Sequence, residues 1–373
     1  MKRTLAILAA IALSFVVFVS PARAASAEAT KAADWIVANH TQSGWTPGTV
    51  ADDVLALAST GDTAYNDEIF NRLTYLKAQA ASYIASGDAV TAAKLAIVAA
   101  ATGQDASDFG GQDLIALVQA GIGGDGSIGD WPGPFSSGIA MVALARNGET
   151  IPSSMVTYLL TYRSADGGFT WATGESTYDT DMTALAILGL QAAQSTDPAL
   201  ADALAFVATQ QQPDGSWSNY SPVNSTGLLG PLMTGAAATN AADYVVSQQV
   251  ANGGLKTGAS GANDPDLLAT QQGILALTGE TFLTITYTVT APTATPTSTQ
   301  SGSTSPTATT TGSPTTTATS TATGTTASAT ASSTASGEEL ADTGADVGAG
   351  LLALSVVTAG AGTALLVRRK PRA

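Results

Sequence analysis

The chain has 373 residues, no cysteine, one histidine and a formal net charge of −15. The length suits one large domain or two small ones, and the absence of cysteine excludes disulfides and zinc sites of the Cys/His kind. Between residues 25 and 345, 7 basic and 28 acidic residues leave a net charge of −21, which repels phosphate and predicts no nucleic-acid partner.

The first 24 residues have the pattern of an export signal. Lys2 and Arg3 give a charged start, the apolar run 5–19 follows, and a small-x-small cleavage site ends at Ala24. The alternative is an uncleaved membrane anchor, for which the apolar run is short. The sequence therefore predicts that residues 1–24 are a signal peptide and that the mature protein is extracellular.

Residues 30–280 contain a repeat with six copies. Each copy has an aromatic or leucine anchor, a Gln-like position four residues later and, in most copies, a Gly-rich turn. The clearest copy comprises Phe206, Gln210 and the turn 214–217. The anchors of the six copies, which are 38 to 48 residues apart, are Trp35, Tyr75, Leu117, Tyr158, Phe206 and Tyr244.

A second apolar helical pattern follows these turns and ends near glycine, as in 53–61, 139–148, 179–190 and 266–279. Asp or Ser at the start caps free amides, and Gly past the end accepts a left-handed turn. Each repeat is therefore predicted to be a helical hairpin. Because the second helices are nearly all apolar, they are expected to form a buried inner ring inside a ring of first helices.

The segment Phe206-x3-Gln210-x4-Gly215-x-Trp217 resembles the repeat motif of squalene cyclases and prenyltransferases, which are α/α toroids, and two further copies keep its spacing. The resemblance covers residues 25–280, about two thirds of the chain. It implies an all-α fold, a six-hairpin α/α toroid whose turns before the second helices open at one mouth. It also implies that Gln210 and Trp217 are structural and tie neighbouring helices together.

The catalytic signatures of that family are missing or incomplete. Its zinc-dependent and thioester members need a cysteine, and class II terpene cyclases need Asp-x-Asp-Asp. This chain has Asp179-Thr180-Asp181-Met182, in which Asp181 would be the proton donor and the last acid is replaced. Helix capping is the other explanation for Asp179 and Asp181. No cofactor or metal is expected.

The predicted function is a ligand-binding or interaction module, and two alternatives stay open. One is an extracellular enzyme, either a polysaccharide hydrolase or lyase or a degenerate terpene cyclase, with Glu175, Asp179 and Asp181 as catalytic candidates. The other is a structural spacer. An unidentified extracellular ligand, neutral or cationic, is expected at the mouth. His40 is expected at the surface. The ligand-binding candidates in the turns before the second helices are Asp52, Asp53, Trp131, Trp171, Tyr178, Asp264 and Asp266.

Two segments of different composition follow the repeats. Residues 281–290 include a run with period-two alternation, which predicts one short strand or an extended exit from the domain. Residues 291–337 are rich in Thr, Ser, Pro and Ala and contain no charged residue. Such a tract has too little apolar surface to offset its ordering entropy, and a disordered stalk is therefore predicted.

Residues 338–373 have the order of a surface-protein sorting signal. A pentapeptide at 340–344 precedes the apolar run 347–367, which is long enough to span a membrane as one transmembrane helix, and a basic tail. The pentapeptide resembles the sortase signal Leu-Pro-x-Thr-Gly, with Ala in place of Pro. The resemblance implies sortase and the cell envelope as partners and cleavage after the threonine. A plain membrane anchor is the alternative. The residues of the pentapeptide are Leu340, Ala341, Asp342, Thr343 and Gly344.

Overall fold

The structure is a computed structural model that describes residues 26–217 and 219–291. The predicted export signal with Ala24, the sorting pentapeptide 340–344, the span 347–367 and nearly all of the predicted stalk lie outside this part of the chain. None of the helices within it is both long and apolar enough to cross a membrane.

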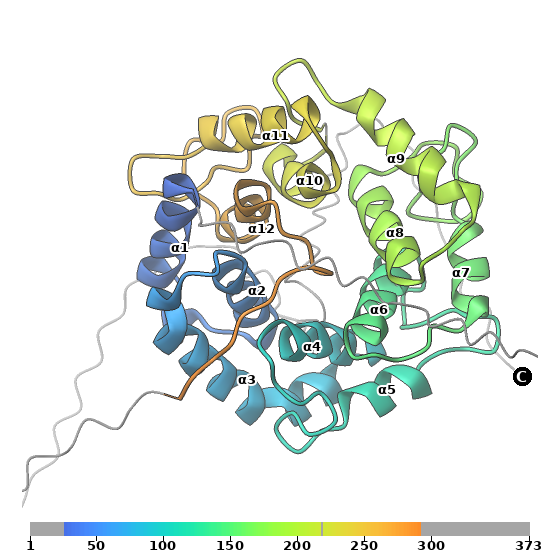
Figure 1. Cartoon of the computed structure of the whole chain (residues 1–373), viewed down its shortest axis with the longest axis horizontal. Helices are drawn as coiled ribbons and strands as arrows, with labels where there is room; N and C mark the ends of the chain where they lie inside the picture. Colours follow the sequence, from blue (N-terminus) through green and yellow to red (C-terminus); the bar gives the residue numbers. More distant parts are fainter. Residues whose placement is uncertain (1–25, 218, 292–373) are drawn as a thin grey trace, which may run out of the picture. The chain divides into compact units, whose positions relative to one another are not determined.

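The described residues form twelve α-helices in two concentric rings (Figure 1). The outer helices each carry one of the six repeat anchors. They are α1 (Ala27–Asn39), α3 (Asn66–Ser86), α5 (Leu114–Ala120), α7 (Ser153–Leu160), α9 (Pro198–Gln210) and α11 (Ala236–Ser247).

The second helix of each repeat lies inside the outer ring and contacts both inner neighbours, so the inner ring closes. The predicted all-α toroid of six helical hairpins is therefore confirmed. The inner helices are α2 (Pro47–Ser59), α4 (Ala89–Ala101), α6 (Pro134–Arg146), α8 (Thr180–Ala192), α10 (Pro222–Leu229) and α12 (Leu267–Thr278).

Capping residues set where the inner helices begin and end. Asp179 accepts from the amides of the first turn of α8, and Asp266 does the same for α12, which ends at Gly279 in the left-handed conformation (φ 75°). Helix α2 departs from the prediction. It begins with a capping box at Thr46, seven residues before the expected cap at Asp53, because Thr46 and Pro47 provide a stronger start.

Glycines in the turns join each of the last four repeats to the next. Gly215 has φ 93°, and a Cβ there would lie 2.2 Å from the Asn240 carbonyl oxygen on the next outer helix. Gly253 has φ 98°, and a Cβ there would lie 2.2 Å from the Lys31 carbonyl oxygen on α1. The last repeat thus packs on the first as successive repeats pack on each other, and this contact closes the ring.

The glutamine one residue after the predicted position also ties repeats together. Gln211 donates to the carbonyls of Gly215 and Ala237, each at 2.9 Å, and Gln249 makes the same two bonds to Gly253 and Glu28.

Gln210 also links neighbouring repeats, as predicted, because its side chain accepts from the Tyr178 hydroxyl of the fourth repeat at 3.2 Å. Helix α9 ends at Gln210, whose amide donates to Thr209, and the extended backbone of Gln211 turns that side chain toward the next repeat. Trp217 is structural, as expected. Its indole is buried and donates to the Val207 carbonyl at 2.7 Å.

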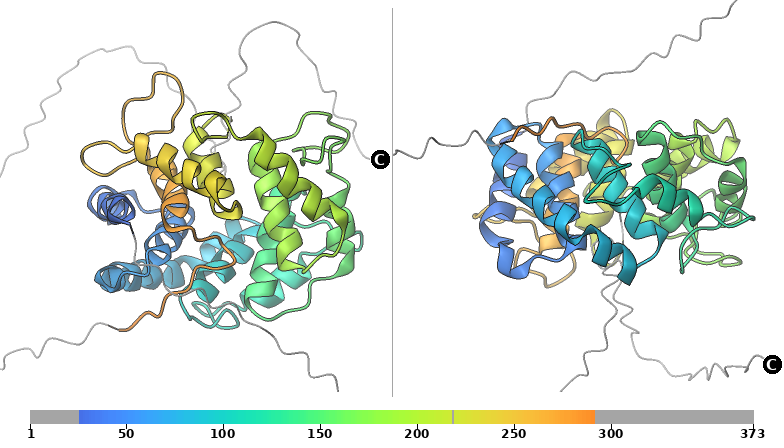
Figure 2. Two further views of the ribbon diagram at one scale, coloured as in Figure 1. Left: turned by 45° about the horizontal axis from the view of Figure 1, so that its top comes forward. Right: turned by 90° about the horizontal axis from the view of Figure 1, so that it is seen from below.

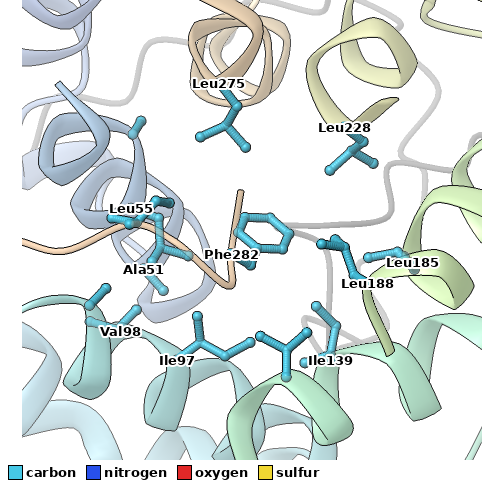
Figure 3. Close-up of a cluster of buried hydrophobic side chains, with 14 of the residues drawn as sticks. Ala51, Leu55, Ile97, Val98, Ile139, Leu185, Leu188, Leu228, Leu275 and Phe282 are labelled. Atoms are coloured by element: carbon cyan, nitrogen blue, oxygen red, sulfur yellow. The ribbon is translucent and has the colours of Figure 1, made fainter. Parts of the chain in front are cut away.

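Apolar side chains from all six inner helices meet at the centre of the toroid (Figure 3). A cavity that admitted water would leave its lining partly exposed, but none of these side chains is more than 4% exposed. The centre is therefore filled at the level of Leu55, Ile97, Ile139, Leu185, Leu188, Leu228, Leu275 and Phe282.

Phe282 comes from the segment 280–291, here called the strap, which crosses the face where the inner helices end (Figures 1 and 2). Arg146 donates to the carbonyls of Phe282 (3.3 Å) and Ile285 (2.6 Å), and the Tyr287 amide donates to Ala101 (2.7 Å). Ile285 and Tyr287 are buried and alternate with exposed residues. The period-two pattern thus reflects packing on helix ends, and no strand occurs between 280 and 291.

Candidate functional site

The opposite face, where the inner helices begin, is here called the mouth. Four long loops form much of it, at 121–133, 161–179, 211–221 and 248–266, each between the outer and inner helix of one repeat. Trp131, Trp171, Glu175, Tyr178 and Asp264 lie in these loops, and Asp179 and Asp266 lie at their ends.

Asp52 was predicted in a mouth turn, but it lies inside α2 and is buried. It accepts from Lys94 of α4 at 2.9 Å, and Lys94 also donates to the Gly48 carbonyl at 2.9 Å. Burial raises the pKa of Asp52 to about 6, although the Lys94 charge acts in the opposite direction. The carboxylate of Asp52 thus links α2 to its inner neighbour α4 through Lys94.

Asp53 is also inside α2, fully buried and fully bonded, and His40 is buried against it. Both predictions were wrong, that Asp53 faces the mouth and that His40 lies at the surface. Asp53 Oδ2 contacts His40 Nδ1 at 2.6 Å and accepts from Arg72 Nε at 2.9 Å, while Oδ1 accepts from Gln271 at 2.7 Å. Arg72 also pairs with Glu68. This network joins the first, second and sixth repeats, so its role is structural.

Burial and charge oppose each other at His40. Burial lowers its pKa, but the hydrogen bond to Asp53 and the Asp53 charge raise it, and the net shift is upward. The partners of this network come from helices far apart in sequence. For the neighbouring link between Asp52 and Lys94 one signal was available, because Lys94 is the only charged residue in 89–101.

The three catalytic candidates do not form a carboxylate pair. Asp179 is occupied as the N-cap of α8, and Glu175 is exposed on its loop. Asp181 lies in the first turn of α8 and accepts from Ser225 Oγ of α10 at 2.6 Å. Burial raises the pKa of Asp181 to about 6, the Asp179 charge adds to this, and the bond from Ser225 opposes it. Met182, at the place of the missing acid, is buried.

Exposed aromatic side chains mark the mouth more clearly than the acids do. Trp131 is 89% exposed, Trp171 63% and Tyr220 56%, and they lie in the mouth loops of the third, fourth and fifth repeats. These three residues are here called the rim aromatics. Tyr178 differs from them, because its ring packs edge-on against Phe206 with 4.7 Å between centroids.

The sequence analysis did not identify Tyr220. The available signal was its position after the turn of the fifth repeat. Tyr220 follows Trp217 by three residues, as Trp131 follows Ile128 by three and Trp171 follows Phe169 by two.

The backbone at Trp131 is fixed on both sides although its ring is exposed. The Asp130 amide donates to Asp88 at 2.7 Å, and Ser136 donates to the Trp131 carbonyl at 2.8 Å. The next residue, Pro132, accepts from the Tyr162 hydroxyl at 2.8 Å, which joins this loop to the fourth repeat.

Trp171 and Tyr220 are held in the same way. The Thr170 amide donates to the Tyr162 carbonyl at 2.9 Å, and the Thr170 hydroxyl donates to the Ala172 carbonyl at 2.7 Å, so the residues on either side of Trp171 are held. The Tyr220 amide donates to the side chain of the preceding residue, Asn219, at 2.8 Å. The adjoining Ser221 donates to the Thr257 carbonyl of the sixth repeat at 3.2 Å. The rings therefore project from ordered backbone.

The described residues include 7 basic and 25 acidic side chains. Five of the seven basic ones are engaged within the fold, so they are poorly placed to attract an anion. Their partners are an acid, a side-chain amide or strap carbonyls. They are Arg72, Lys77, Lys94, Arg146 and Arg163.

No family model and no curated protein matches the sequence. Among solved structures, the chain is similar to the type II terpene cyclase MstE from Scytonema, an aspartate-to-asparagine variant in complex with its substrate geranylgeranyl dihydroxybenzoate. The TM-score is 0.51 at 14% sequence identity, over 67% of this chain and 95% of that chain. At this identity the likeness shows the fold, a terpene-cyclase-like toroid.

Proposed function

We propose that this protein is a binding module displayed at the cell envelope, with its ligand on the mouth of the toroid. The proposal for display rests on the export pattern at 1–24 and on the order of pentapeptide, apolar run and basic tail in 338–373. The proposal for binding rests on the fold and on the exposed rim.

One observation carries the binding proposal. The rim aromatics expose large apolar rings on three successive loops whose backbones are hydrogen-bonded in place. Leaving such area in water forgoes stabilisation of about 25 cal/mol per Å². Exposed apolar groups that gather on one face are typical of binding surfaces.

The filled centre supports a ligand at the mouth over a ligand deep in the toroid. A terpenoid bound at the level of Phe282 would have to displace side chains from several inner helices. Two further observations weigh against cyclase chemistry. Met182 stands where that family has its last acid, and Asp179 is committed to capping α8.

An extracellular enzyme acting on polysaccharide is the second candidate, and Asp181 is the observation in its favour. A carboxyl with a pKa of about 6 is suited to general acid catalysis near neutral pH. Asp181 lies in the first turn of α8, the inner helix that follows the Trp171 loop. Asp181→Asn separates the two candidates, because it would abolish turnover in an enzyme and leave ligand affinity within about twofold in a binding module.

Binding can be tested by ligand-induced thermal stabilisation of the full chain. A ligand at 100 times its Kd raises the free energy of unfolding by about 2.7 kcal/mol. We expect at least one neutral or cationic ligand to stabilise the protein and Trp171→Ala to reduce the effect. Stabilisation that survives replacement of all three rim aromatics would contradict the proposed location. No stabilisation by glycans, terpenoids or small cofactors would favour a spacer.

Display can be tested separately with Thr343→Ala. In the proposal, the wild-type protein resists detergent extraction from envelopes and is released by wall digestion, whereas the variant stays in the detergent-soluble membrane fraction. Equal extraction of both forms would reject sortase attachment and leave a plain membrane anchor.

A further inference from the structure

The rim aromatics form an array, and its arrangement indicates the kind of ligand it fits. Trp131, Trp171 and Tyr220 come from consecutive repeats. The inner helices of the third, fourth and fifth repeats pack on one another in that order, so the three loops follow one another around the mouth. A small molecule would cover one ring, whereas a chain of linked units would extend over all three.

Direct contacts connect the loops that carry the array. The Tyr162 hydroxyl bonds to Pro132 at 2.8 Å, and a Cβ on Gly133 would lie 3.8 Å from the Trp171 carbonyl oxygen. The fourth and fifth repeats are joined where the Tyr178 hydroxyl donates to Gln210 at 3.2 Å and where Ser225 donates to Asp181. The repeats that carry the rings are thus joined to one another directly, and the backbones of their loops are ordered before any ligand binds.

The charge of this surface limits the ligand further. Asp130 adjoins Trp131, Glu175 lies in the Trp171 loop, and both are exposed. Two basic side chains lie in the mouth loops. Arg163 is paired with Asp202, and Lys256 belongs to the sixth repeat, outside the three loops that carry the rim aromatics. A polyanion would therefore meet repulsion at the rim.

The exposure of the rim aromatics to solvent argues against a small cation as the ligand. Recognition of a quaternary ammonium group by aromatic rings relies on placing the cation within about 6 Å of the ring faces, in a cage that removes it from water. Here each ring lies on its own loop and is more than half exposed. The arrangement is an open track, and open aromatic tracks suit a polymer that remains partly hydrated.

We infer that the rim aromatics bind a neutral polysaccharide, with sugar rings stacked on Trp131, Trp171 and Tyr220 along three successive repeats. The apolar C–H faces of the sugars cover the aromatic rings, and their hydroxyls donate to nearby carboxylates such as Asp130. This inference rests on the proposed binding function and adds the class of ligand. No bond is made or broken in the interaction.

The test uses isothermal titration of the full chain with neutral hexasaccharides of glucose, mannose, galactose and N-acetylglucosamine. We expect at least one of them to bind and its affinity to fall about tenfold or more when it is shortened to a disaccharide. Trp131→Ala and Trp171→Ala should each weaken binding about tenfold or more, as for central aromatic contacts. Val246→Ala, which removes an exposed apolar group on α11, is the matched control and should leave affinity unchanged.

Other outcomes distinguish this inference from the proposed function. If choline or hexagalacturonate binds through the rim aromatics and no neutral hexasaccharide does, the polysaccharide inference fails and the binding function stands. If a hexasaccharide binds equally well after replacement of all three rim aromatics, the inferred site is wrong. Failure of every probe to bind would overturn the inference. Equal circular dichroism and Tm among the variants would exclude misfolding as the reason for a loss.

Discussion

The two faces of the toroid use aromatic side chains in opposite ways. At the closed face, the strap places Phe282 at the centre of the inner ring and buries Tyr287 against helix ends. At the mouth, Trp131 and Trp171 project into solvent from loops that are equally well hydrogen-bonded. The exposure of Trp131 and Trp171 is therefore not a result of poorly ordered loops. One face contributes stability, and the other is available to a ligand.

Replacing Phe282 with Ala should produce a large loss of stability. The substitution leaves a cavity among side chains of several inner helices and should lower the free energy of unfolding by about 3–5 kcal/mol. Urea unfolding followed by circular dichroism measures this loss. The exposed strap residue Thr286 provides the control, because Thr286→Ala should cost less than about 0.5 kcal/mol. A loss below about 1 kcal/mol for Phe282→Ala would show that the closed face does not depend on the strap.

Gly253→Ala should show that the mouth loops are fixed by their contacts with the next repeat. The new Cβ would meet the Lys31 carbonyl at the ring closure, and the residue would keep a left-handed backbone. Overpacking costs about 1–3 kcal/mol and the left-handed conformation about 1–2 kcal/mol, so we expect about 2–4 kcal/mol in total.

Gly261→Ala is the matched control for Gly253→Ala, because Gly261 also has a positive φ but no atom near the position of a Cβ. It should show only the backbone cost of about 1–2 kcal/mol. Equal losses in the two variants would mean that the contact with α1 does not hold the ring closed.

The pH dependence of stability should report the carboxyl of Asp181 at the mouth. Its pKa is about 6 in the folded protein and near 3.8 when unfolded. The folded state thus holds the proton more tightly, and the stability that this provides is full below about pH 3.8 and is lost as the pH rises through 6. Asp181→Asn should therefore flatten the fall in unfolding free energy between about pH 4 and 6, by roughly 1–3 kcal/mol. His40 has the same sign and is unchanged in the variant. Identical slopes would contradict a raised pKa at Asp181.

Removal of an exposed rim tryptophan should have the smallest effect on stability. Trp171→Ala should change the free energy of unfolding by less than about 0.5 kcal/mol, because the ring is mostly in water. The same substitution at the buried Trp217 should cost about 3–5 kcal/mol. A large loss of unfolding free energy for Trp171→Ala, measured under the same conditions, would indicate that this ring stabilises the mouth.

Local patterns in the sequence predicted the parts of the fold that local rules determine. The repeat anchors lie on the outer helices, and Asp179 and Asp266 cap α8 and α12, because caps act within one turn of the chain. The spacing did not distinguish Gln210 from Gln211, since only the end of α9 decides which side chain faces the next repeat.

Long-range contacts account for what the sequence did not predict. The burial of Asp53 and His40 depends on Arg72 from α3 and Gln271 from α12, and the latter lies 218 residues away from Asp53. The strap is similar, because its alternating pattern fits a strand as well as a segment packed on helix ends. Tyr220 follows the turn of its repeat as Trp131 and Trp171 follow theirs, but the sequence does not show that its ring is exposed. Its significance appears only when the loops of three repeats come together.

The most direct test of a ligand at the mouth compares its affinity for two variants of the full chain, Trp171→Ala and Phe282→Leu, under conditions where both are folded. With the neutral hexasaccharide that binds the wild type most tightly, isothermal titration should show a loss of about tenfold or more for Trp171→Ala. Phe282→Leu, at the filled centre, should leave the affinity within about twofold. The reverse pattern, with affinity retained in Trp171→Ala and lost in Phe282→Leu, would place the ligand inside the toroid and contradict the account.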